Sequence, residues 1–359
     1  MPVTTGMKGE GFYDEHSAPQ LAAIAAVLPW LEDALGTMEW ADREGPIVLA
    51  DFGCSEGRNS IVAAKRLLAV IRARTTRPVQ TVHCDLPTNN FNQLFANLFP
   101  AGGPSRVEPN VYSACVGGSM FDQLLPPGTA SVAMTFNAIG YLDRKPQVPM
   151  TDYILPMGPG RPRSGVQVTR EARQAYADQA RDDLARFFLA RARELVAGGK
   201  LLVASFGSGA PYRCSDGIYD VVNDALLDLV AARRIPRNAY EAIVFPVYFR
   251  TEEELVEPVV GAGSAAEKMY RLDRVGSTES PVPFNERLRE NGDVKAYARD
   301  YTSFLRAFTE PILRLTLSGL PNLDGLFTEL YAQIESRLAA DPEGYALHYV
   351  QVAALFTRV

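Results

Sequence analysis

The sequence predicts an α/β protein with a doubly wound, mostly parallel sheet and an inserted, mostly helical cap. Two observations carry this prediction. Short apolar runs alternate with segments of helical apolar spacing as far as residue 206, and strands separated by crossover helices run in the same direction. Two long stretches then break the alternation before a last strand-like run returns, which is the pattern of insertions into a single core.

The first strand is expected at residues 47–52, because an apolar run there ends in a glycine turn. A helix follows at residues 59–74, where Ile61, Leu67 and Ile71 recur on one helical face. The other expected elements are strands at 79–84, 111–116, 130–136, 200–206 and 345–357, and a long helix at 170–196.

Two stretches of the chain interrupt the alternation of strands and helices, and they differ in composition. Residues 144–169 are rich in proline and glycine, and residues 233–341 mix helical patterns with many aromatic side chains. We interpret both as cap insertions. The complete division is an N-terminal segment with the first half of the core (1–143), a cap insertion (144–169), the second half of the core (170–232), a mainly helical cap (233–341) and a final core strand (342–359).

Composition excludes several classes of protein. A net charge of −6 without any run of lysine and arginine argues against a nucleic-acid partner. No apolar run is long enough to span a membrane and no secretory signal is visible, so we expect a soluble, cytoplasmic protein. The four cysteines lack C-x-x-C spacing and only three histidines are present, so no metal site is expected.

Small and acidic residues stand where the first two strands end. Asp51, Gly53 and Gly57 stand where the first strand turns into the first helix. Bare backbone beside a helix N-terminus suits a charged or polar ligand. Asp85 ends the second strand, where its two oxygens could accept both hydroxyls of a ribose. The G-x-G-x-x-G pattern of dinucleotide sites is missing, which favours S-adenosylmethionine (SAM) over NAD. The alternative is that the glycines only close tight turns.

Several motifs resemble those of the SABATH carboxyl methyltransferases, which methylate salicylic, benzoic, jasmonic and indole-acetic acids and some ring nitrogens. The most specific is Asp85-Leu-Pro-Thr-Asn-Asn-Phe-Asn92, which is similar to the family's D-L-P-x-N-D-F-N. Asp51-Phe-Gly-Cys-Ser-Glu-Gly-Arg-Asn59 resembles D-L-G-C-S-x-G-P-N. The N-terminal motif, Met7-Lys8-Gly9 followed by Tyr13 and Ser17-Ala-Pro-Gln20, resembles M-K-G … S-Y-x-x-N-S-x-x-Q. The resemblance extends to Arg306-Ala307 and Glu310-Pro311, and so covers nearly the whole chain. It also includes bacterial fatty-acid methyltransferases, and the chain resembles a bacterial member.

The resemblance implies a Rossmann-like, class I SAM-dependent methyltransferase core with seven, mostly parallel strands. It implies SAM as the cofactor, S-adenosylhomocysteine as its product and, because relatives are often dimers, a homodimer. The residues that it implies around the cofactor are Lys8, Ser17, Asp51, Gly53, Asn59, Asp85, Leu86, Ser119 and Met120. Gln20 is implied to hold the substrate carboxylate.

The chain departs from the family where the substrate is expected to bind. In the segment that resembles S-S-Y-S-L-H-W-L, Asn137 stands for Tyr, Gly140 for His or Met, and Tyr141 for Trp. We expect Asn137 to make the substrate site more polar and Gly140 to enlarge it, which suits an acid longer or bulkier than benzoate.

A carboxylic acid is already an anion at neutral pH, so its methylation needs no general base, which agrees with the few histidines. Neutral donors are the better partners for it, because an arginine would stabilise the charged reactant more than the transition state. Gln20, with Tyr141 as a second donor, meets this requirement. The sequence therefore predicts a SAM-dependent O-methyltransferase that forms methyl esters of aromatic or fatty acids. A methyltransferase acting on a heterocyclic nitrogen and a noncatalytic SAM-binding protein remain alternatives.

Overall fold

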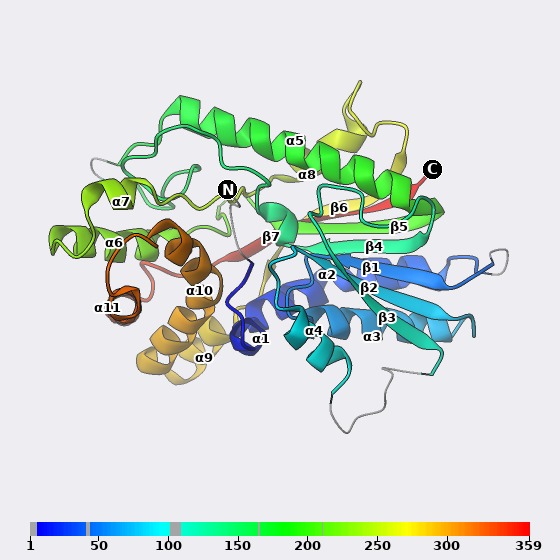
Figure 1. The fold of residues 1–359 in the computed structure, drawn as a ribbon, viewed down its shortest axis with the longest axis horizontal. Helices are drawn as coiled ribbons and strands as arrows, with labels where there is room; N and C mark the ends of the chain where they lie inside the picture. Colours follow the sequence, from blue (N-terminus) through cyan, green and yellow to red (C-terminus); the bar gives the residue numbers. More distant parts are fainter. Residues whose placement is uncertain (1–5, 41–43, 101–108, 164–165, 210) are drawn as a thin grey trace.

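The computed structural model describes residues 6–40, 44–100, 109–163, 166–209 and 211–359, so residues 164–165 of the expected insertion lie outside it. Its centre is a seven-stranded sheet with the order β3-β2-β1-β4-β5-β7-β6 (Figure 1). The strands are β1 (Ile47–Phe52), β2 (Val79–Asp85), β3 (Val111–Gly117), β4 (Ala130–Phe136), β5 (Leu195–Phe206), β6 (Tyr270–Ser280) and β7 (Tyr349–Arg358).

The first five strands are parallel, and β7 lies antiparallel between β5 and β6. The fold class expected from the sequence is confirmed. β1 and β4 have the expected bounds, while β5 begins earlier because helix α5 (Arg170–Glu194) passes directly into it at Leu195.

Strand β6 lies inside the stretch expected to be mainly helical cap, and the sequence-based division misplaces it. It pairs with β7 from Tyr270 to Ser280 and forms the edge of the sheet. Most of its side chains are at least partly exposed, so the strand has no apolar run. The periodic signal by which a buried strand is recognised is absent from its sequence.

Helices cover both faces of the sheet. On one face, α2 (Ala18–Gly36) and α3 (Arg58–Arg72) pack on alternate strand residues such as Ile47 and Leu49. On the other face, α5 and α8 (Glu252–Val260) pack on the residues between them, such as Val48 and Phe52. Since successive strand residues point to opposite faces, the continuous apolar run of β1 reflects burial on both sides.

The remaining helices form a lobe beside the sheet (Figure 1). They are α6 (Ile218–Ala231), α7 (Arg237–Glu241), α9 (Pro283–Asn291), α10 (Val294–Thr316) and α11 (Leu323–Ala340). Helix α6, which the sequence assigned to the core, shares its buried apolar cluster with α10 and α11 and therefore belongs to the cap. Its strongly apolar face contacts other helices in place of the sheet.

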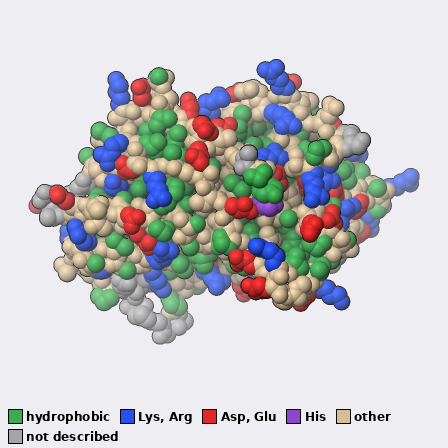
Figure 2. Space-filling model, turned by 180° about the vertical axis from the view of Figure 1, so that it is seen from behind, with side chains coloured by type: hydrophobic (Ala, Val, Ile, Leu, Met, Phe, Trp, Pro, Cys, Tyr) green, Lys and Arg blue, Asp and Glu red, His purple; other side chains and the backbone are tan. Residues whose placement is uncertain are grey.

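The shorter elements lie at the junction of sheet and lobe. They are α1 (Phe12–His16), α4 (Phe91–Leu98) and the 3-10 turn η1 (Ala138–Gly140). No helix in the described ranges is long and apolar enough to cross a membrane. On the face drawn in Figure 2, acidic and basic side chains are interspersed, without one sign gathering over the described residues.

Candidate active site

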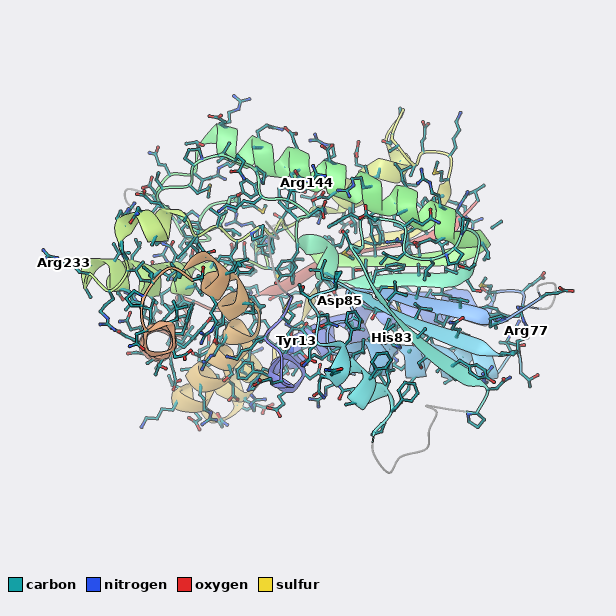
Figure 3. The ribbon with its side chains drawn as sticks, in the orientation of Figure 1. Tyr13, Arg77, His83, Asp85, Arg144 and Arg233 are labelled. Atoms are coloured by element: carbon teal, nitrogen blue, oxygen red, sulfur yellow. The ribbon has the colours of Figure 1, made fainter. Side chains whose placement is uncertain are left out.

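The carboxyl ends of β1, β2 and β3 meet at one edge of the sheet. Their register aligns Phe52 with Cys84 and Asp85 with Gly117, so the turns that follow these strands are neighbours. The Asp85 carboxylate accepts the backbone N–H of Ser55 at 2.6 Å and its own neighbour's N–H, at Leu86, at 2.8 Å. These two bonds fix its orientation at the sheet edge, beside Tyr13 from α1 (Figure 3).

The glycines of the first turn are required by conformation as well as by space. Gly53 and Gly57 have φ of 95° and 98°, which L side chains rarely adopt. A Cβ on Gly53 would stand 2.2 Å from the Cβ of Ala138, and one on Gly57 would stand 2.3 Å from Leu94. Gly53, unlike Gly57, also lines a cavity at this edge of the sheet. The turn therefore packs tightly and also leaves bare backbone toward a ligand.

One cavity, with a volume of about 260 Å³, runs from this edge into the helical lobe. At the sheet edge, it is lined by Gly53, Ser55, Cys84, Asp85, Leu86, Gly118, Ser119, Met120, Phe121 and Leu124. Toward the lobe it is lined by an aromatic wall, defined as Phe206, Tyr219, Phe249, Phe304 and Phe308. A smaller adjoining pocket contains Asp51, Asn59 and Gln20. A polar end and an apolar end therefore share one space.

Four buried oxygen atoms around these two pockets have no hydrogen-bond partner: Gln20 Oε1, Asp51 Oδ1, Ser55 Oγ and Asn137 Oδ1. An unpaired buried polar group costs about 1–3 kcal/mol. Asp51 Oδ1 and Ser55 Oγ, at the end of β1, can accept hydrogen bonds, so this end of the site favours a ligand that brings N–H or O–H donors. SAM carries an ammonium group, a sulfonium and a ribose diol, and the residues present fit it.

Burial also sets the charge of the acidic groups. It raises the pKa of Asp51 to about 7, and the nearby Asp85 adds to this rise. Burial likewise raises the pKa of Asp85, against the lowering effect of its two backbone hydrogen bonds. A carboxyl group whose pKa is raised by burial regains its charge when a cation binds beside it.

Histidine, lysine and arginine are absent from the described residues that line the main cavity. His83 lies within the sheet (Figure 3), hydrogen-bonded to Ser60 and Thr81, and burial lowers its pKa to about 4. His16 stacks on Phe12, and His348 pairs with Glu279 at 2.8 Å. The cavity thus holds neutral donors and carboxylates, without a nitrogen base or a cationic clamp among its described residues.

The profile of the family described as SAM-dependent carboxyl methyltransferases matches residues 2–358. The chain belongs to this family. Its reaction is the transfer of a methyl group from SAM to a carboxylate, which gives a methyl ester.

Several relatives align with most of this carboxyl methyltransferase. Gibberellic acid methyltransferase 1 of Arabidopsis thaliana is 27% identical, with 94% of this chain and 92% of the relative covered. The O-methyltransferase acrG of Aspergillus aculeatus is 29% identical, with 98% and 96% covered. A solved structure of loganic acid methyltransferase with S-adenosylhomocysteine has a TM-score of 0.78 at 19% identity, covering 98% of each chain, which shows a shared fold.

Most of the residues expected around the cofactor of this carboxyl methyltransferase come together. Gly53, Asp85, Leu86, Ser119 and Met120 line the cavity. A second group lies in or behind the smaller pocket. It consists of Asp51 and Asn59, which line that pocket, and Ser17, whose hydroxyl accepts the Asn59 side-chain N–H at 3.2 Å.

Lys8 is the exception. Its ammonium pairs with Glu310 of α10 at 2.6 Å, and its backbone N–H donates to Ala307 at 2.8 Å. It lines neither pocket. Its neighbour Met7 does line the main cavity, so Lys8 anchors the N-terminal segment beside the cavity.

The residues expected around the substrate also come together, except Gly140. Gln20 is buried in the first turn of α2 and lines both pockets, while Asn137 and Tyr141 flank η1 and line the main cavity. Asn137 adopts φ of 64° and donates its side-chain N–H to the Tyr349 hydroxyl at 3.1 Å. Burial raises the pKa of Tyr141, so its hydroxyl stays protonated as a donor.

Gly140 does not enlarge the cavity, contrary to the expectation. A Cβ at this position would stand 2.5 Å from the ring of Phe206. The aromatic ring already fills the space that the missing side chain leaves, and Gly140 is not among the lining residues.

Besides Tyr219 of the aromatic wall, two tyrosines at the site have no role assigned from the sequence. Tyr13 and Tyr349 line the cavity, and both have a pKa raised by burial. Tyr13 belongs to the N-terminal motif, which was a signal for it. Tyr349 begins β7, and only the return of this last strand to the sheet brings it near Asn137.

Proposed function

We propose that this carboxyl methyltransferase esterifies a bulky, mostly apolar carboxylic acid. The observation that carries the proposal is the cavity itself, which joins a polar end at Asp85 to the aromatic wall without a described histidine, lysine or arginine along it. An acceptor that is ionised in water needs no base from the protein. An apolar body needs an apolar wall.

We place the cofactor along the ends of β1, β2 and β3. Bound SAM supplies an electrophilic methyl group on a sulfonium centre. Asp85 is suited to accept hydrogen bonds from the ribose hydroxyls, and Asp51 to face the methionine ammonium. Support comes from the unpartnered Asp51 Oδ1 and from the fixed orientation of the Asp85 carboxylate.

We place the acid's carboxylate between the cofactor and the aromatic wall. Gln20, Asn137 and Tyr141 are its proposed partners, since all three line this cavity and each can donate a hydrogen bond. The role of these residues is alignment: they hold the carboxylate oxygen in line with the methyl group and exclude water. Neutral donors leave the attacking oxygen more reactive than an ion pair would.

The aromatic wall supports a bulky acid. The rings of Phe206 and Phe249 have centroids 5.6 Å apart, and Phe304 and Phe308 have centroids 5.2 Å apart, so the wall is continuous. Acids named for relatives of this chain, gibberellic acid and indole-3-acetic acid, have polycyclic skeletons. We therefore expect polycyclic and terpenoid acids to be better substrates than benzoate.

The test is to incubate the purified protein with SAM and acids of graded size, and to identify methyl esters by mass spectrometry. Benzoic, indole-acetic, long-chain fatty and polycyclic terpenoid acids form the series. Ester from the polycyclic acids at the highest kcat/KM supports the proposal. Ester from benzoate alone contradicts the proposed bulk of the substrate.

A second measurement tests the proposed absence of a base. The kcat is expected to be independent of pH from about 6 to 9, because the acid is ionised throughout this range. The amide of the best acid is the matched control, since it has the same skeleton without the carboxylate. Turnover of the amide or of neutral nitrogen heterocycles would favour the nitrogen-acceptor alternative. Bound SAM without any methylated product would favour a noncatalytic protein.

Other features stay predictions from the sequence. They are the homodimer, the cytoplasmic location, the bacterial origin and, apart from strand β6 and helix α6, the division of the chain into core and cap.

A further inference from the structure

A buried ion pair lies beneath the cofactor end of the cavity without lining it. Arg191 and Glu194 stand in the last turn of α5, and their side chains are 0% and 1% exposed. Arg191 Nε lies 2.6 Å from Glu194 Oε2, and its guanidinium is stacked 3.7 Å from the centroid of the Phe52 ring. Phe52 directly precedes the glycine turn of the site.

The pair holds one loop by four backbone groups. Arg191 donates to the carbonyl oxygens of Met120 at 2.6 Å and Asp122 at 2.8 Å. Glu194 Oε1 accepts the backbone N–H groups of Leu124 at 2.5 Å and Leu125 at 2.9 Å. All four groups belong to residues 118–125, which we call the 118–125 loop.

This loop forms much of the cavity's polar end. Gly118, Ser119, Met120, Phe121 and Leu124 all line the cavity. A Cβ on Gly118 would stand 2.4 Å from Leu124, so the loop is folded tightly on itself. Its shape therefore depends on the partners that its backbone finds inside the protein.

A contribution to folding stability does not explain why an ion pair is buried at this position. Replacing a buried ion pair by apolar side chains of similar volume is often neutral or stabilising, because desolvation offsets the attraction between the charges. Apolar side chains cannot, however, serve two backbone carbonyls and two backbone amides at once. The specific task of the pair is the conformation of the loop.

We propose that Arg191 and Glu194 are positioning residues for the cofactor, which fix the 118–125 loop in the shape that binds the adenosyl part of SAM. The inference rests on the proposed placement of SAM along the ends of β1, β2 and β3. The pair therefore affects the affinity for SAM, and it does not affect the KM for the acid once SAM is saturating.

The test is the double variant R191M/E194M, whose side chains are close in volume to the originals. We expect it to fold with a lower melting temperature than the wild type, because four backbone groups lose their partners. We expect it to bind SAM at least about tenfold more weakly, which corresponds to the loss of about one hydrogen bond. The kcat and the KM for the acid, measured at saturating SAM, are expected to be unchanged. A folded variant with wild-type SAM affinity overturns the proposal.

A matched control is K200M/D273M. Lys200 and Asp273 form a partly buried ion pair at 3.4 Å between β5 and β6, and neither lines a pocket. Its SAM affinity should equal that of the wild type. An equal loss of SAM affinity in both double variants would show a general effect of removing ion pairs and would overturn the positioning role.

Hydrogen exchange on the wild-type protein keeps the proposal testable if R191M/E194M does not fold. S-adenosylhomocysteine should slow the exchange of the Leu124 and Leu125 amides by a larger factor than it slows the exchange of the α11 amides. Unchanged rates at both leucines would overturn the proposal.

Asp85→Ala separates this inference from the proposed function. If it loses SAM binding while R191M/E194M keeps it, only the positioning role fails. If Asp85→Ala itself binds SAM normally, the placement of the cofactor is wrong and the inference falls with it.

Discussion

At the scale of single residues, burial decides the charge of the pocket before any ligand arrives. Asp51 is 3% exposed, and its pKa is raised to about 7 by burial and by Asp85. Binding of a cation favours the carboxylate and so lowers this pKa. SAM binding to the protonated form must release a proton, and affinity must therefore fall as the pH drops below 7.

We expect the dissociation constant for SAM to rise about tenfold from pH 7 to pH 5.5, as one proton must leave a group with pKa about 7. This window lies below the pKa of the cofactor's own amino group, whose charge stays constant. Calorimetry in two buffers of different ionisation enthalpy would count the released proton. Asp51→Asn should bind weakly at every pH, and a pH dependence that persists in it would assign the proton to another group.

Gln20 is the residue on which the placement of the acid depends most. Gln20→Glu keeps the size of the side chain but puts a negative charge against the acid's carboxylate. We expect the KM for the acid to rise at least about tenfold through this repulsion. SAM affinity should not fall, because the new charge is opposite to that of the cofactor.

Gln333→Glu is the matched control for Gln20→Glu. Gln333 also has a buried side-chain oxygen without a partner, but it lies on α11 and lines neither pocket. Its variant should keep both the KM for the acid and the SAM affinity. If Gln20→Glu behaves in the same way, Gln20 has no contact with the acid.

The site shows why some residues can be predicted from sequence and others cannot. Asp51, Gly53 and Asp85 stand at the carboxyl ends of β1 and β2, so their place at a common sheet edge follows from local pattern and parallel pairing. Phe206 and Phe304 come from segments far apart in the chain, and only tertiary packing brings them to one wall. At Gly140, the missing side chain indicates free space when the sequence is considered alone. In the structure, the ring of Phe206 occupies that space.

At the scale of elements, the same distinction separates β1 from β6. The first strand is buried on both faces and is apolar throughout, so its bounds were predicted to the residue. The edge strand β6 exposes polar side chains to solvent and is held in place by its backbone pairing with β7. Pairing of that kind leaves little trace in the sequence of one strand.

A carboxylate of α10 helps to hold the N-terminal segment at the cavity. Glu310 accepts from Lys8 at 2.6 Å, from Arg306 at 2.5 Å and from Arg314 at 2.6 Å. Burial alone would raise its pKa, but these three donors outweigh burial and lower the pKa to about 2. A folded-state pKa below the unfolded value means that the contribution to stability is full above about pH 4.5 and is lost as the pH falls toward 2.

We expect Glu310→Gln to weaken this attachment at neutral pH. Met7 and Tyr13 then lose their fixed positions at the cavity, so the KM for both SAM and the acid should rise. Urea unfolding at a series of pH values should show the wild type losing its advantage over the variant as the pH falls from about 4.5 toward 2. Asp324→Asn is the control, because Asp324 is 90% exposed and shares only Arg314 with the cluster. A constant difference in unfolding free energy across this range would contradict the assignment.

At the scale of the whole molecule, the cavity joins three parts of the chain. The sheet edge contributes Asp85, the N-terminal segment contributes Tyr13, and the helical lobe contributes Phe304 and Phe308. Tyr349 at the start of β7 adds the C-terminal strand to the same site. A ligand that fills the cavity touches all of these parts, and it binds only when they are assembled.

S-adenosylhomocysteine should therefore stabilise the assembled molecule as one unit. At 100 times its dissociation constant it adds about 2.7 kcal/mol, which corresponds to a few degrees in melting temperature for a protein of this size. Far-UV circular dichroism follows the helices of the lobe and the sheet, and tryptophan fluorescence follows Trp30 and Trp40, which pack on the sheet. Both transitions should shift together, because sheet edge and lobe share the cavity. A shift of the fluorescence transition alone would mean that the lobe unfolds independently of the cofactor site.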